Sequence, residues 1–134
     1  MPFQIIRNDI TKVHADAIVN TANPKPVIGG GTDSGIYAAA GAEQLLDARK
    51  KIGDIQPGNA VETPAFQLDA KYIIHTVGPY YIDGRHGERE QLESCYRSIL
   101  ALAQEKRCRS IAIPSISTQC SHHAAPAVRE RRLR

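Results

Sequence analysis

Two neighbouring stretches decide the fold of this 134-residue chain: DAIVNTAN at residues 16–23 and GGGTDSGIYAAAG at residues 29–41. Residues 15–20, which overlap the first stretch, predict a short buried strand that ends in a turn-rich, polar segment. The second opens with three glycines and continues into an alanine-rich segment, for which Thr32 and Asp33 favour a helix start. A strand, a glycine turn and a helix in this order are typical of an α/β domain.

Strand and helix signals keep alternating along the rest of the chain. We expect a helix over residues 42–51, which Gly53 stops, and another over residues 89–105, whose apolar residues recur at three- and four-residue spacing. Further strands are predicted over residues 3–6, 59–63, 72–77 and 110–113. The pattern predicts a mixed, largely parallel sheet with helices on both faces.

The charge of the chain is concentrated at its end. The last nine residues carry four arginines and one glutamate, which account for the whole net charge of +3. The remainder is balanced and contains two Phe, five Tyr and no Trp, so it has neither the basic stripe nor the aromatic density of a nucleic-acid surface. We therefore expect no specific nucleic-acid partner, and only weak, salt-sensitive attraction by the tail.

Membrane and metal-binding signals are missing from the sequence. No apolar run approaches the ~18 residues of a membrane span, and the N-terminus lacks the apolar region and cleavage site of a signal peptide. The cysteines, Cys95, Cys108 and Cys120, form no C-x-x-C pair, and Cys120 with His122 and His123 matches no zinc spacing. We expect a cytoplasmic protein that needs neither a metal nor a cofactor.

The three glycines at 29–31 are the main candidate for a binding site. Glycine allows positive φ and lets a ligand approach the main chain, and free amides at the following helix start favour a phosphate group. No lysine follows, which excludes a Walker loop, and Ser34 replaces the third glycine of a dinucleotide fingerprint. From the glycines alone, a plain turn between strand and helix is the favoured interpretation, because glycine-rich turns before helices are common.

Polar residues beside the glycines strengthen the binding interpretation. Asn20 and Asn23 follow the buried strand, at the sheet edge where open α/β folds bind ligands, and their amides suit sugar hydroxyls. Asp9 follows the first predicted strand and suits an adenine amino group. The alternative is purely local: the Asn side chains cap turns, and Asp9 caps a turn before Thr11.

Four segments, in their order and spacing, resemble successive signatures of macro domains. They are NDIT at residues 8–11, DAIVNTAN at 16–23, the run at 29–41, and YIIHTVGP at 72–79. The resemblance covers residues 3 to about 118 and implies a three-layer α/β/α sandwich that binds ADP-ribose. It places Asp9 at the adenine amino group with Ile10 beside the ring. The residues that it implies for ADP-ribose binding are Asp9, Ile10, Asn20, Ala22, Asn23, Gly29, Gly30, Gly31, Thr32, Asp33, Ser117 and Thr118.

The resemblance also implies a hydrolytic pair. Hydrolytic macro domains carry Asn, six residues, Gly-Gly, an aliphatic residue and Asp; here Asn23 and Asp33 fit this pattern, with Thr32 in the aliphatic position. Tyr37 stands where the family's helix normally carries His. In this interpretation Asn23 positions the distal ribose and Asp33 orients or activates a water. The alternative for Asp33 is a plain helix N-cap.

The sequence changes character after Thr118. Residues 119–134 lack the glycines and the aromatic residue of the family's second phosphate loop, so we expect an incomplete macro domain over residues 1–118, without the last helix and strand, followed by an irregular basic tail. Such a truncated domain predicts weakened binding and self-association through the uncovered face. Three functions stay open: hydrolysis of ADP-ribosyl or O-acetyl-ADP-ribose esters, non-catalytic reading of ADP-ribose, and an inactive remnant.

Overall fold

The computed structural model of the chain describes residues 3–79, 85 and 87–116. Helices and strands alternate within them, as the sequence predicts. In chain order they are the 3-10 helix η1 (Ile10–Lys12), β1 (Ala17–Thr21), α1 (Thr32–Ala40), α2 (Ala42–Ile52), β2 (Ala60–Pro64), β3 (Tyr72–Thr76), α3 (Glu88–Glu105) and β4 (Ile111–Ala112).

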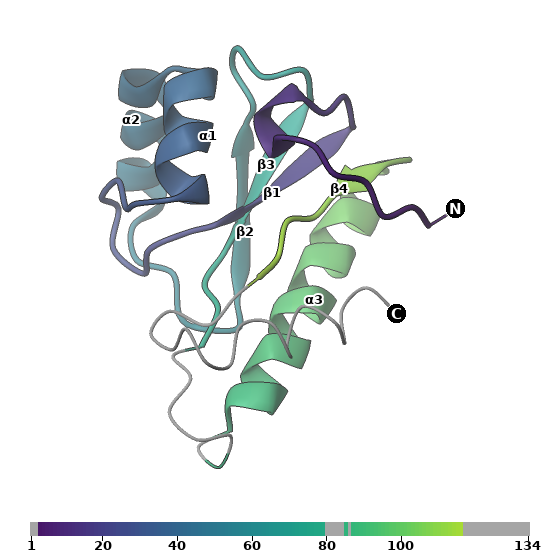
Figure 1. Cartoon of the computed structure of the whole chain (residues 1–134). Helices are drawn as coiled ribbons and strands as arrows, with labels where there is room; N and C mark the ends of the chain where they lie inside the picture. Colours follow the sequence, from purple (N-terminus) through teal and green to yellow (C-terminus); the bar gives the residue numbers. More distant parts are fainter. Residues whose placement is uncertain (1–2, 80–84, 86, 117–134) are drawn as a thin grey trace.

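The strands of the described residues form one sheet in the order β2-β3-β1-β4. β1 runs parallel to both of its neighbours, β3 and β4, whereas β2 runs antiparallel to β3. Helices α1 and α2 cover one face of this sheet and α3 covers the other (Figure 1). The predicted mixed, largely parallel sheet between helical layers is confirmed.

The alternation of side chains along β1 divides the core into two halves. Ile18 points to the face covered by α1 and α2, where it packs with Ile36 and Leu45. Val19, one residue on, points to the opposite face and packs with Ile99 of α3. Successive residues of a strand face opposite sides of a sheet, so the first three residues of this central strand, Ala17–Val19, are apolar on both faces.

The predicted strand over residues 3–6 is wrong. The described residues 3–8 belong to no strand, and Phe3, Ile5 and Ile6 are exposed. A strand persists only in a ladder of hydrogen bonds, and no strand of the described part of the chain pairs with this segment. The β-prone composition was therefore insufficient. The predicted tail, residues 119–134, lies outside the described residues.

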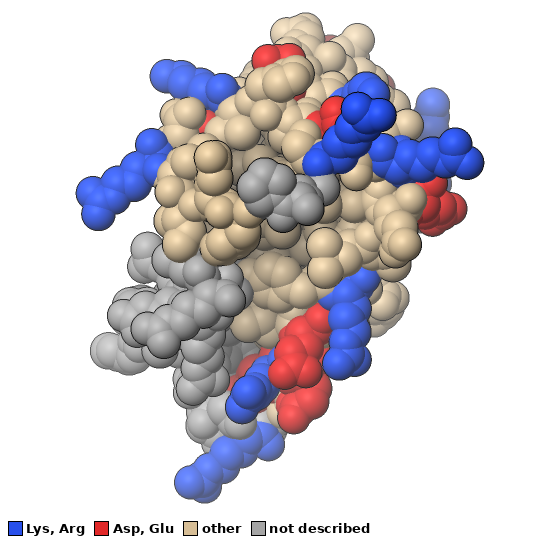
Figure 2. Space-filling view, turned by 90° about the vertical axis from the view of Figure 1, so that its right-hand side faces the viewer, with Lys and Arg blue, Asp and Glu red and all other residues tan. Residues whose placement is uncertain are grey.

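The surface carries charges of both signs without a continuous basic stripe on the side drawn in Figure 2. Lys and Arg side chains project there from separate places, and Asp and Glu side chains lie among them (Figure 2). Of the helices in residues 3–79 and 87–116, none has the length and apolar character needed to cross a membrane.

Candidate functional site

The carboxylate of Asp33 joins the end of β1 to the glycine loop. Asp33 lies in the first turn of α1 and is almost fully buried. Its Oδ1 accepts a hydrogen bond from Asn20 Nδ2 at 2.7 Å, and its Oδ2 accepts one from the amide of Gly29, also at 2.7 Å. No side-chain hydrogen bond caps α1, so the interpretation of Asp33 as a plain N-cap is wrong. Asp33 instead fixes the loop that precedes its own helix.

Gly29 and Gly31 each favour glycine at their position in the loop, for different reasons. A Cβ on Gly29 would lie 2.6 Å from Asn23 Nδ2 and 3.3 Å from Asp33 Oδ2, so any side chain here would displace the amide of Asn23. Gly31 has φ of 63°, a conformation that favours glycine. Gly30 differs from both, because a Cβ there would meet nothing within 4 Å. The loop is thus built by Gly29 and Gly31, and Gly30 leaves open space beside it.

A small polar cavity of about 60 Å³ opens between the loop and the end of β1. Bulk water occupies ~30 Å³ per molecule, so the cavity has room for one ligand group and a water. Thr21 is the one lining residue that the sequence analysis did not name, although its position at the end of β1 is the signal that could have found it. The cavity is lined by Thr21, Ala22, Asn23, Gly29, Gly30 and Asp33.

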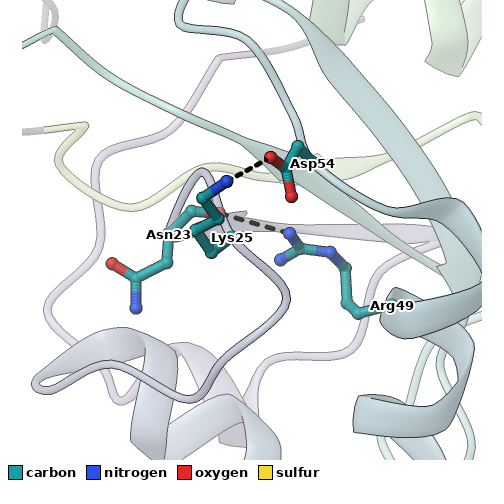
Figure 3. Close-up of polar contacts among 4 residues, drawn as sticks. All are labelled: Asn23, Lys25, Arg49 and Asp54. Atoms are coloured by element: carbon teal, nitrogen blue, oxygen red, sulfur yellow. Dashed lines mark hydrogen bonds and ion pairs between the residues drawn. The ribbon is translucent and has the colours of Figure 1, made fainter.

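The end of α2 and the residues that follow it contact the loop around Asn23 on the side away from the cavity. The guanidinium of Arg49 donates from Nη2 to the carbonyl oxygen of Asn23 at 3.2 Å. Lys25 Nζ pairs with Asp54 Oδ2 at 2.7 Å, and the amide of Ile55 donates to the Pro24 carbonyl at 2.8 Å. The side chain of Asn23 points away from Arg49 (Figure 3). These three contacts therefore fix the backbone of the loop and leave the side-chain amide of Asn23 on the cavity side.

Arg49 is a fully buried cation, which is rare for this residue type. Its Nε and Nη1 have no hydrogen-bond partner among the described residues. The last turn of α2, where Arg49 sits, presents carbonyl groups whose partial negative charge favours a cation. The sequence analysis missed Arg49. Its position four residues after the buried Leu45, on the same helix face, is the signal that could have found it.

A larger cleft of about 440 Å³ lies elsewhere, between α2 and β2. Exposed apolar side chains, Ile52 and Phe66, contribute to it, together with Asp47 and Glu62. It contains no glycine and no helix N-terminus, the two features that favour an anionic ligand. The glycine-loop cavity is therefore the better candidate despite its smaller volume.

Comparison with known proteins identifies the architecture. A model of the macro domain matches residues 19–130. The chain belongs to the macro domain family. A protein of Salmonella gallinarum named O-acetyl-ADP-ribose deacetylase is 53% identical over 119 residues, which cover 86% of this chain and 66% of that protein. The chain thus spans slightly less than two thirds of the length of that relative.

Solved macro domains share the fold. The macrodomain of Oceanobacillus iheyensis with ADP matches with a TM-score of 0.81 and 38% identity, over 92% of this chain and 70% of that one. The Trypanosoma brucei macrodomain in complex with ADP-ribose matches with a TM-score of 0.75 and 38% identity, over 84% of this chain and 46% of that one. The three-layer α/β/α sandwich predicted from the sequence is confirmed.

Five of the predicted binding residues line the cavity of this macro domain, and the others lie elsewhere. The five are Ala22, Asn23, Gly29, Gly30 and Asp33. Asn20 is fully buried, and its Nδ2 donates to Asp33, so it supports the site from inside rather than lining the cavity. Asp9 is exposed outside the cavity and caps η1, where its Oδ1 accepts hydrogen bonds from the amide and the hydroxyl of Thr11. These hydrogen bonds lower the pKa of Asp9. Ile10 packs against the core beneath α1, Thr32 begins α1 in an exposed position, and Ser117 and Thr118 lie outside the described residues.

Tyr37, which stands where the family's helix normally carries His, is buried in α1 of this macro domain. Burial raises the pKa of the Tyr37 phenol, and the carboxylate of Asp33 raises it further. A neutral phenol is therefore the form present near neutral pH. The described part of the chain brings together no cluster of His, Cys, Asp and Glu that could hold a metal ion, and Cys120, His122 and His123 lie outside it.

Proposed function

We propose that this macro domain binds ADP-ribose through its glycine loop and hydrolyses ADP-ribosyl esters such as O-acetyl-ADP-ribose. The observation that carries the proposal is that Asn23 and Asp33 both line the cavity of about 60 Å³ beside the glycine loop. Support also comes from the relative named O-acetyl-ADP-ribose deacetylase and from the related structure bound to ADP-ribose. One edge of the distal ribose would reach into the cavity, with the diphosphate along Gly30 and the amides at the start of α1.

The chemistry needs one water in a fixed orientation. Each oxygen of the Asp33 carboxylate already accepts one hydrogen bond from the protein and retains a lone pair for a water in the cavity. That water attacks the acyl carbon of the ester, the bond between this carbon and the ribose oxygen breaks, and the ribose oxygen takes up the proton that the water loses. The products are ADP-ribose and a carboxylic acid. General-base assistance of this kind contributes about 10²–10⁴-fold.

Two measurements test the proposal together. Calorimetry with ADP-ribose measures binding, and release of acetate from O-acetyl-ADP-ribose measures turnover. We expect Asp33→Ala to abolish turnover, and Asn23→Ala to weaken both binding and turnover. Asp47→Ala, which removes an exposed carboxylate on α2 outside the cavity, is the matched control and should change neither.

The other functions left open by the sequence appear as outcomes of the same experiment. Binding without turnover in the unmodified protein would identify a non-catalytic reader of ADP-ribose. No heat at millimolar ADP-ribose would identify an inactive remnant and exclude both other functions.

A further inference from the structure

A continuous line of buried hydrogen bonds crosses the sheet and ends on Asp33. Thr63 Oγ1 on β2 lies 2.9 Å from His75 Nε2 on β3, and His75 Nδ1 lies 3.1 Å from Asn20 Nδ2 on β1. Asn20 Nδ2 in turn donates to Asp33 Oδ1 at 2.7 Å. None of the four side chains is more than 4% exposed. The line therefore connects β2, at one edge of the sheet, to the cavity through side chains that are almost fully buried.

The strand register creates this alignment. Asn20 and His75 are direct partners in the parallel pairing of β1 with β3, so their side chains project from the same face of the sheet. Thr63 is paired with Ile73 in the antiparallel ladder and lies diagonal to His75. Three polar residues thus stand side by side on three adjacent strands.

The positions of the protons follow from the acceptor at the end of the line. A carboxylate only accepts, so Asn20 must turn its NH₂ group toward Asp33. The second hydrogen of this group then meets His75 Nδ1, which must carry a lone pair. The proton of the neutral ring consequently sits on Nε2 and is donated to Thr63, whose hydroxyl donates onward to the carbonyl of Pro64 at 3.1 Å.

We propose that His75 is a positioning residue: Thr63 holds its Nε2–H tautomer, which fixes the amide of Asn20 and thereby the carboxylate of Asp33. The proposal rests on the proposed function, in which Asp33 orients the water. In the other tautomer, Nδ1–H would point at the NH₂ group of Asn20. That amide would then rotate and present its oxygen to the carboxylate, acceptor against acceptor, so Asp33 would lose its partner.

Protonation of His75 would have the same effect as the wrong tautomer, since both ring nitrogens would then donate. Burial and, secondarily, the nearby charge of Arg49 lower the pKa of His75 to about 3. The ring is thus neutral throughout the physiological range. Its protein partners alone, rather than pH, select the tautomer.

Thr63→Val tests the proposal without touching the cavity. Valine has nearly the shape of threonine but cannot accept from Nε2–H, so both tautomers become accessible. Thr63→Ser keeps the hydroxyl and should rescue. Thr76→Val is the matched control: it also removes a buried threonine hydroxyl, one that donates to the Asn59 carbonyl and takes no part in the line.

Three readouts are measured on each variant. Long-range ¹H–¹⁵N spectra of histidine-labelled protein report the tautomer of His75, assigned with His75→Gln. The amide resonance of Gly29 reports its hydrogen bond to Asp33, and steady-state kinetics report kcat and KM separately. We expect the unmodified protein to show Nε2–H only. We expect Thr63→Val to mix the tautomers, shift the Gly29 amide and lower kcat about tenfold with KM within about twofold.

Several outcomes would overturn the proposal. An Nδ1–H tautomer in the unmodified protein would do so, as would a Gly29 amide that stays in place when Thr63→Val mixes the tautomers. Equal loss of kcat in Thr63→Val and Thr76→Val would mean that Thr63 acts only through the stability of the fold, not through the tautomer of His75. If the unmodified protein shows no turnover, the proposed function fails, but the tautomer and the Gly29 resonance still decide whether His75 positions Asp33.

Discussion

The guanidinium of Arg49 and the carbonyl oxygen of Asn23 lie 3.2 Å apart, and this hydrogen bond connects the last turn of α2 to the backbone of the loop that lines the cavity. The contact is made at the main chain, so it does not depend on the side chain at position 23. This bond fixes the backbone at Asn23, near the start of the loop, and the bond from the Gly29 amide to Asp33 fixes the glycines at its end.

Replacement of Arg49 by methionine should weaken ligand binding more than it weakens the fold. Methionine fills similar space, and a buried cation with unpartnered nitrogens gains little net stability from its charge. Loss of the bond to Asn23 loosens the loop, so we expect roughly tenfold weaker ADP-ribose binding, about 1.4 kcal/mol, by calorimetry. Lys25→Ala, which removes the exposed ion pair with Asp54 on the same loop, is the control and should change affinity less than about twofold. Similar effects of both changes would contradict a special role for Arg49.

The glycines should respond differently to alanine. Gly29→Ala places a Cβ against the Asn23 amide, so we expect about 1–3 kcal/mol of destabilisation and loss of binding. Gly30→Ala meets open space and should change the free energy of unfolding by less than about 1 kcal/mol. Denaturant unfolding and calorimetry on both variants separate the effects. If a ligand approaches Gly30, its alanine variant loses affinity although it folds normally; unchanged affinity would place the ligand elsewhere.

The lowered pKa of His75 predicts that the free energy of unfolding falls in acid. Its folded pKa, about 3, lies below the unfolded value of about 6.5, so the unfolded chain binds the extra proton between these limits. Stability from this group is complete above pH 6.5 and falls as pH decreases toward 3, at up to about 1.4 kcal/mol per pH unit. His75→Gln offers one acceptor and one donor but does not titrate. Urea unfolding between pH 8 and pH 4 should therefore show a shallower decline for the variant; equal slopes would mean that other groups cause the acid sensitivity.

Asp9→Asn separates the two roles considered for this residue. Asparagine retains an oxygen that can cap η1 through Thr11, so the melting temperature should stay close to that of the unmodified protein. If the carboxylate contacts the adenine amino group, affinity for ADP-ribose falls about fivefold, whereas affinity for ribose 5-phosphate stays the same. Unchanged affinity for both ligands would leave Asp9 with the capping role alone.

The sequence predicted the local parts of the site well. A short strand, three glycines and a helix start lie within 25 residues, so Asn23 and Asp33 had to meet once the chain folded back at the glycines. The helices were confirmed for a similar reason, because their signals are local: α3 carries its own apolar spacing, and α2 stops before Gly53, which has φ of 90°.

The distant supports could not be predicted in this way. The contact of Arg49 with the Asn23 carbonyl depends on how α2 is placed on the sheet, and the line from Thr63 to Asn20 depends on the register of three strands. Neither is encoded by residue spacing. The strand expected over residues 3–6 was wrong for a related reason, because a strand needs a partner and composition does not reveal one.

The central place of β1 has a consequence for how the site opens. β3 pairs with β1 along its whole length and β4 pairs with Ala17 and Ile18, so the amides of β1 in these ladders should exchange with solvent only when the whole domain unfolds. The connection that follows is different: Val27 and Ile28 are exposed, and this segment should open in local excursions that leave the sheet intact. The wall of the cavity formed by β1 should thus open only on global unfolding, whereas the wall formed by the loop should also open locally. A ligand that contacts both walls stabilises the protein mainly by suppressing the local opening, so its protective effect should be concentrated in the ten residues between β1 and α1.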